Sequence, residues 1–173
     1  AWLLCGSLPK GYFDAFGNFR FLSKEPEGKL ALAHYDAAFA LQEIVLLQTQ
    51  YTDRFFQLCR LEGGFCMMSA SLLICLDEAG TETSRQSLDA KDGWSFAAIQ
   101  EADGVLYVLT RKFYGEELPE LRKFAPDTLS ALEADTCTSE VIGLGLCADG
   151  RLLMGNREEP VSYTHLRAHE TLS

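Results

Sequence analysis

The fold is decided by the stretch Ser95-Phe96-Ala97-Ala98-Ile99-Gln100, Asp103-Gly104, Val105-Leu106-Tyr107-Val108-Leu109-Thr110. Asp-Gly between two apolar runs predicts a β-hairpin, because a tight primed turn needs residues that accept a positive φ. A third run, Leu121-Arg122-Lys123-Phe124, and the turn Ala125-Pro126-Asp127-Thr128 lead to a fourth run, Leu129-Ser130-Ala131-Leu132. Residues 94–135 are therefore predicted to form a four-stranded antiparallel meander.

Parts of this meander recur on both sides of it. With Gly64, Gly104 and Gly150 aligned, the segment Glu62-Gly63-Gly64-Phe65-Cys66-Met67-Met68 overlays Ala102-Asp103-Gly104-Val105-Leu106-Tyr107-Val108 and Ala148-Asp149-Gly150-Arg151-Leu152-Leu153-Met154. The third run recurs too, since residues 74–80 overlay residues 122–128, with an insertion at 113–120 absorbing the difference in spacing. A four-strand unit of roughly 40 to 50 residues has the period of a β-propeller blade.

Over about residues 51–157, this pattern of apolar strand, Asp-Gly, Leu-Tyr-Val-Leu and Leu-x-x-Phe-x-Pro-Asp resembles the blades of bacterial quinoprotein-like propellers. More loosely, it is similar to the propeller ahead of the binding module in some bacterial extracellular solute-binding proteins. No Gly-His…Trp-Asp signature of a WD40 repeat is present. The resemblance implies an all-β fold, a partial β-propeller of about two and a half four-stranded antiparallel blades. The alternative is a β-sandwich with coincidentally similar hairpins.

We expect three parts along the chain. Residues 1–50 form a poorly defined N-terminal segment, interpreted as a degenerate blade. Residues 51–160 form the blades, divided at 51–90, 91–137 and a truncated 138–160. Within the first part, residues 29–50 fit either a helix, by their alanine content, or two strands at 37–41 and 44–49 around Gln42-Glu43. The propeller context favours strands.

The third part, residues 161–173, is interpreted as a non-native tail. Residues 161–171 back-translate to DNA that resembles the adapter of transposase-based sequencing libraries, and its reading frame requires a codon ending in CT before Val161, as Pro160 allows. His165 and His169 would share one helical face suited to a metal, but they lie in this tail and carry no weight. The authentic chain is then expected to end near Pro160, inside a blade, and removing the tail should leave folding unchanged or improved.

Charge and hydropathy exclude several classes of partner. The net charge of −10 without a basic run argues against nucleic acid, whose phosphates need clustered Lys and Arg. It argues equally against anionic membrane surfaces. No stretch reaches the ~18 to 20 apolar residues of a transmembrane helix, so no integral membrane segment is expected. The remaining partners are a small molecule, a sugar or a protein.

The cysteines show neither Cys-x-x-Cys nor zinc spacing. Cys59 and Cys66 flank the first hairpin, which predicts that they lie diagonally across one sheet face. A disulfide between them requires Cα atoms within about 7 Å. The favoured interpretation is that they are small buried hydrophobic residues in strands.

Other candidate site residues have ordinary structural explanations. His34 has no nucleophile near it in sequence, so a structural role is favoured over catalysis. Asp77 and the Asp-Gly pairs lack the Asp ladder of a calcium loop, and turn chemistry explains them. Gly143-x-Gly145 has no helix after it and so is not a nucleotide loop.

Aromatic residues on the predicted strands raise one further possibility. Trp94, Phe96 and Tyr107 are predicted to pack between sheets. Asp92 with Trp94 could instead line a ligand face near the blade entrance. We therefore predict no catalytic residues, cofactor-binding residues or metal ligands.

The favoured function is a non-catalytic binding or interaction scaffold, part of a bacterial propeller that is secreted or attached to the cell surface. The repeat, together with the lack of a catalytic set, motivates this hypothesis. The alternative is a fragment of a propeller enzyme of quinoprotein or lyase type, whose catalytic residues would lie in blades outside this chain. No cofactor is predicted for this chain.

Overall fold

The computed structural model describes residues 1–5, 11–13, 19–21, 30–47, 53, 55–88, 93–112, 114, 116–137, 140–147, 150 and 152–156. All regular secondary structure in these residues is β-strand. The expected adapter-like tail with His165 and His169 lies outside them, as do Asp92 and Asp149.

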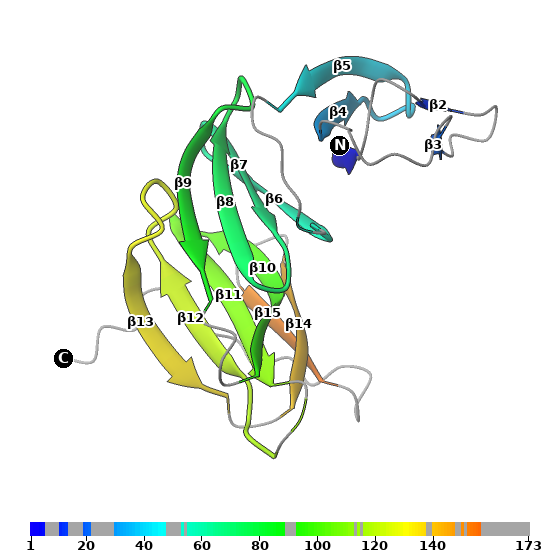
Figure 1. The fold of residues 1–173 in the computed structure, drawn as a ribbon. Helices are drawn as coiled ribbons and strands as arrows, with labels where there is room; N and C mark the ends of the chain where they lie inside the picture. Colours follow the sequence, from blue (N-terminus) through cyan, green and yellow to red (C-terminus); the bar gives the residue numbers. More distant parts are fainter. Residues whose placement is uncertain are drawn as a thin grey trace.

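All the strand pairings are antiparallel, and most join strands that are consecutive in the chain (Figure 1). The strands are β1 (Trp2–Cys5), β2 (Gly11–Phe13), β3 (Phe19–Phe21), β4 (Ala31–Tyr35), β5 (Leu41–Leu46), β6 (Gln57–Leu61), β7 (Gly64–Met68), β8 (Leu72–Asp77), β9 (Glu82–Ser87), β10 (Trp94–Ala102), β11 (Val105–Lys112), β12 (Glu120–Phe124), β13 (Ala131–Thr136), β14 (Val141–Leu146) and β15 (Leu152–Asn156). Two sheets have four strands in sequence order, β6-β7-β8-β9 and β10-β11-β12-β13. The others are β1-β4-β5, β2-β3 and β14-β15.

The predicted meander is confirmed in β10–β13. Asp103 and Gly104 form the first turn with φ of 49° and 74°, as a primed hairpin turn requires. The fourth strand begins at Ala131, two residues later than predicted. Leu129 has a φ of 53°, its N–H donates to the carbonyl of Ala125 at 2.8 Å, and its side chain is buried, so it belongs to the turn.

The first four-stranded sheet, β6–β9, shows that the sequence alignment slipped by one residue. The β6–β7 turn is Glu62-Gly63, and Gly63 (φ 78°) is the structural equivalent of Gly104. Gly64 already lies in β7, opposite Leu61. The predicted diagonal placement of Cys59 and Cys66 is therefore wrong, because a turn one residue earlier puts these two cysteines directly opposite each other. Both thiols are free.

Residues 30–47 form strands, as the propeller context predicted, but at other positions. β4 and β5 are joined by a turn at residues 36–40, not at Gln42-Glu43. Asp36 fixes this turn, since its Oδ1 accepts hydrogen bonds from the N–H groups of Ala38 and Ala40 at 2.8 and 2.9 Å. This arrangement is an Asx-type turn, which needs only one short acidic side chain.

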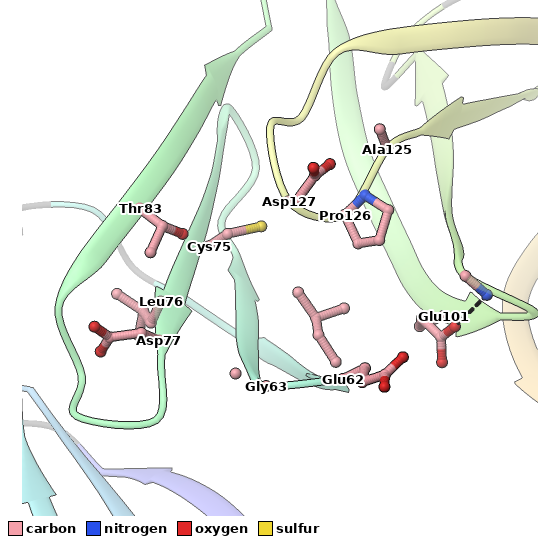
Figure 2. A pocket seen from close by; sticks show the side chains of 13 residues that line it. Glu62, Gly63, Cys75, Leu76, Asp77, Thr83, Glu101, Ala125, Pro126 and Asp127 are labelled. Atoms are coloured by element: carbon pink, nitrogen blue, oxygen red, sulfur yellow. Dashed lines mark hydrogen bonds between the residues drawn. The ribbon is translucent and has the colours of Figure 1, made fainter.

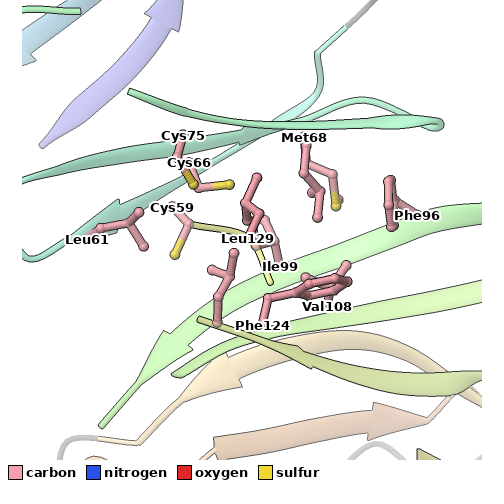
Figure 3. Close-up of a cluster of buried hydrophobic side chains, with 12 residues drawn as sticks. Cys59, Leu61, Cys66, Met68, Cys75, Phe96, Ile99, Val108, Phe124 and Leu129 are labelled. Atoms are coloured by element: carbon pink, nitrogen blue, oxygen red, sulfur yellow. The ribbon is translucent and has the colours of Figure 1, made fainter. Parts of the chain in front are cut away.

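Four of these sheets pack face to face, and hydrophobic side chains fill the spaces between them. One cluster lies between β6–β9 and β10–β13 (Figure 3), a second between β10–β13 and β14–β15, and a third between β6–β9 and the sheet of β1, β4 and β5. Successive side chains of β11 alternate between the first two clusters: Leu106 and Val108 enter one, Tyr107 and Leu109 the other. Strands buried on both faces explain the continuous apolar runs of the sequence.

The first strands of successive sheets lie next to one another, because β10 contacts both β6 and β14. The last strand of the second sheet, β13, is exposed along its whole length. Sequential four-stranded meanders stacked through their faces, with neighbouring first strands, constitute a partial β-propeller (Figure 1). The chain is all-β, and its described residues include two four-stranded blades, a two-stranded sheet after them and the three-stranded sheet β1-β4-β5 before them.

Candidate functional site

A pocket of about 600 Å³ lies between the two four-stranded blades. It opens at the end of the sheets where the β6–β7, β10–β11 and β12–β13 turns meet (Figure 2). Its lining residues come from these turns and from the adjoining strand ends: Leu61, Glu62, Gly63, Gly64, Cys75, Leu76, Asp77, Thr83, Glu101, Gly104, Ala125, Pro126 and Asp127. A volume of this size falls in the range of small-ligand sites.

The pocket exists because the blades are repeats. In each blade, the turn after the first strand and the turn after the third strand lie at the same end of the sheet. Stacking two such blades brings Glu62, from the first turn of one, to the same hollow as Asp127, from the last turn of the other. Residues far apart in sequence thereby line one surface.

The lining is strongly acidic. It includes four carboxylates, those of Glu62, Asp77, Glu101 and Asp127, and no basic side chain among the residues named above. Two of the carboxylates are fixed by backbone N–H groups: Oδ1 of Asp77 accepts from Thr81, and Oε1 of Glu101 accepts from Gly104, both at 2.8 Å (Figure 2). The anchored oxygens leave each carboxylate with a second oxygen, so the pocket presents negative charge in fixed positions.

Hydrogen bonds between β6 and β10 also fix the backbone at Glu101. Its N–H donates to Sγ of Cys59 at 3.2 Å. Two residues earlier, the Gln57 side-chain amide donates to the carbonyl of Ile99 at 3.1 Å and accepts from its N–H at 3.0 Å. Burial of the Cys59 thiol raises its pKa to about 11, so the thiol stays protonated at this contact between β6 and β10. β6 thus fixes the strand that carries Glu101.

One nucleophilic side chain reaches the pocket. Cys75 on β8 lines it and is about 1% exposed, with its sulfur drawn toward the hollow in Figure 2. The hydrogen bond from the neighbouring Cys66 thiol lowers the pKa of Cys75, since it stabilises the thiolate. The same contact raises the pKa of Cys66, which is also buried.

Of the residues weighed from the sequence, Asp77 and Gly104 line the pocket, and His34, Trp94, Phe96 and Tyr107 are not among its lining residues. His34 on β4 stacks on Trp2, with ring centroids 4.6 Å apart. Phe96 and Tyr107 pack between sheets as predicted. Trp94 is half-buried, and the ammonium of Lys112 lies 5.6 Å from the centroid of its ring.

The glycines and aspartates of the sequence motifs have structural roles. Gly143 and Gly145 lie within β14. Asp103 lies in a turn, and Asp77, the last residue of β8, accepts a hydrogen bond from the Thr81 N–H in the turn that follows, as turn chemistry predicted. Within the described part of the chain, no three His, Cys, Asp or Glu side chains are arranged to hold a metal ion, and no helical segment has the length and apolar character needed to cross a bilayer.

Sequence reasoning missed the pocket residues Glu62, Cys75, Glu101 and Asp127. Each was seen only as a turn or strand residue. The repeat could have indicated two of these residues. Glu62 and Asp127 occupy turns that the alignment already placed at the same end of consecutive blades.

No protein-family model matches the chain, and neither does any curated protein. Solved structures with low sequence identity do. BBS1N in complex with ARL6DN has a TM-score of 0.49 and 15% identity, over 88% of this chain and 46% of that one. A protein of unknown function from Bacteroides caccae has a TM-score of 0.44 and 11% identity, over 96% and 71%. The WD40 domain of SCAP from fission yeast has a TM-score of 0.37 and 13% identity, over 80% and 37%. This chain spans less than half the length of the first of these.

Proposed function

We propose that the chain is a non-catalytic binding scaffold whose inter-blade pocket takes a cationic group, an arginine or lysine side chain of a partner protein. The observation that carries the proposal is the pocket itself, which has ligand-sized volume, four carboxylates and no basic side chain among its described lining residues. The expected setting, a secreted or surface-attached bacterial protein, remains part of this proposal.

Physical arguments favour a cation over other ligands. Carboxylates at the walls of a concave site focus the negative potential, which attracts positive charge and repels anions. Asp77 and Glu101 are already oriented by backbone hydrogen bonds, so binding costs little side-chain entropy at these positions. The guanidinium group of arginine matches carboxylate oxygens with several donors at once, which makes arginine the best fit.

The proposal is tested with an acetylated, amidated peptide that carries two arginines, measured by calorimetric titration against the full chain. Its matched control is the same peptide with citrulline in place of arginine, which keeps the shape and removes the charge. The double variant Glu62→Gln/Asp127→Asn should weaken arginine-peptide binding roughly two- to thirtyfold, because each partly exposed charge pair contributes about 0.2–1 kcal/mol.

A second double variant controls for the overall charge of the chain. Glu116→Gln/Glu140→Gln removes the same two charges at exposed positions outside the pocket lining. We expect this variant to bind the arginine peptide as the parent chain does. Equal weakening in both variants, or equal binding of the citrulline peptide, would contradict a pocket that recognises cations.

A further inference from the structure

The β6–β9 sheet carries a row of three cysteines across neighbouring strands. Cys59 on β6 lies opposite Cys66 on β7, and Cys66 lies opposite Cys75 on β8. Directly opposite residues of an antiparallel pair point to the same face of the sheet, so all three thiols enter the cluster between the two blades (Figure 3). All three are free.

The two neighbouring pairs in this row are not equivalent. Leu61 and Gly64 flank a two-residue turn and so form a hydrogen-bonded pair, which makes Cys59 and Cys66 a hydrogen-bonded pair as well. Because backbone groups alternate in direction along β7, Cys66 and Cys75 form a non-hydrogen-bonded pair. Such pairs have Cα atoms about 4.5 Å apart and closer side chains, inside the range that a disulfide spans.

The contacts of the three thiols also differ between the Cys59–Cys66 pair and the Cys66–Cys75 pair. Sγ of Cys59 accepts the N–H of Glu101 on β10 at 3.2 Å, so it is engaged with the second blade. Cys66 instead shares a hydrogen bond with Cys75, which lowers the pKa of Cys75 and raises that of Cys66. Cys75 is also the member of the row that lines the pocket. A small reagent that enters the pocket would therefore meet Cys75 first.

We propose that Cys66 and Cys75 form a reversible cross-strand disulfide by exchange with a small organic disulfide that enters the inter-blade pocket. This goes beyond the proposed binding function and does not depend on it. In the first step, the Cys75 thiolate attacks one sulfur of R–S–S–R, a Cys75–S–R bond forms, the original S–S bond breaks and RS⁻ leaves with the proton that Cys75 gave up.

In the second step, Cys66 loses its proton and its sulfur attacks Sγ of Cys75. The mixed disulfide breaks, and the second RS⁻ leaves with the proton from Cys66. The two cysteines together lose two electrons, and R–S–S–R is reduced to two molecules of RSH. Exchange is favoured when the pKa of the attacking thiol is lowered and a second thiol is held beside it, and Cys75 has a lowered pKa with Cys66 directly opposite.

The test treats the full chain with 2-hydroxyethyl disulfide at mildly alkaline pH. Remaining thiols are alkylated, and the chain is digested and mapped by mass spectrometry. We expect a linked peptide pair joining Cys66 to Cys75, with the loss of two hydrogen atoms, that disappears on reduction with dithiothreitol. The half-exposed Cys147 reports in the same sample that the reagent is active.

Two variants separate the members of the row. Cys66→Ser should stop the reaction at a hydroxyethyl mixed disulfide on Cys75, since no second thiol is beside it to resolve the bond. Cys59→Ser should leave the Cys66–Cys75 link unchanged. Two outcomes in the treated parent chain would overturn the proposal. In one, Cys66 and Cys75 both remain alkylatable although Cys147 has reacted with the reagent. In the other, the disulfide joins Cys59 to Cys66. Because these outcomes are read on the parent chain, they hold even if a variant fails to fold.

Discussion

At the level of single residues, the adjacent glycines 63 and 64 have different tasks that the sequence does not distinguish. Gly63 has a positive φ in the turn. Gly64 lies in β7 where a Cβ atom would be 2.1 Å from the carbonyl oxygen of Leu76, so only a glycine allows the backbones of β7 and β8 to approach. Either glycine fits a hairpin turn, so the prediction slipped by one residue. Only the close approach to β8 resolves it.

Substitution of Gly64 should therefore be unusually costly for a strand position. We expect Gly64→Ala to lower the free energy of unfolding by about 3 kcal/mol or more, because the new methyl group meets backbone that must shift. Urea denaturation followed by tryptophan fluorescence measures this change.

Gly155→Ala on β15 is the matched control, since a Cβ atom there meets nothing within 4 Å. Its effect should stay within about 0.5 kcal/mol. Similar losses in the two variants would show that β7 and β8 do not approach as described.

At the level of strands, hairpin patterns were predictable where apolar runs flank a glycine turn. β10 and β11 followed from Asp-Gly, while β4 and β5 were misplaced because the alanine-rich segment has little periodicity and its turn depends on Asp36 alone. Contacts between blades were not predictable. The side-chain amide of Gln57 forms two hydrogen bonds with the backbone of Ile99, as the backbone of a neighbouring strand would. No pattern in the sequence predicts these hydrogen bonds.

Removal of this bridge should weaken the joint between the blades. Gln57→Leu keeps the size of the side chain but leaves the N–H and carbonyl of Ile99 without these partners, and we expect a loss of about 1–3 kcal/mol in unfolding free energy. Chemical denaturation provides the measurement.

The same substitution at Gln100 serves as a control. The Gln100 amide donates only to the adjacent carbonyl of Glu101, within its own strand, among the contacts described here. Gln100→Leu should cost much less than Gln57→Leu. If the two variants lose equal stability, Gln57 does not join the blades.

At the scale of the whole molecule, the repeat predicted the propeller architecture, because four-stranded units recurred with two matching landmarks. The pocket could not be predicted with it. Its position depends on how two sheets stack face to face, and hence on side chains in the cluster between them, such as Phe96, Val108 and Phe124. That stacking brings four acidic residues that are far apart in the sequence to the lining of one pocket.

The central claim is that the turns of two consecutive blades meet to form a pocket that recognises cations. Its most direct test is nuclear magnetic resonance of the isotope-labelled chain during titration with the two-arginine peptide. The account predicts that the shifted backbone amides gather at Gly63, Gly104 and Asp127, which belong to three separate turns of the two blades. Shifts confined to the outer strands β9 and β13, or spread evenly over the acidic surface, would contradict it.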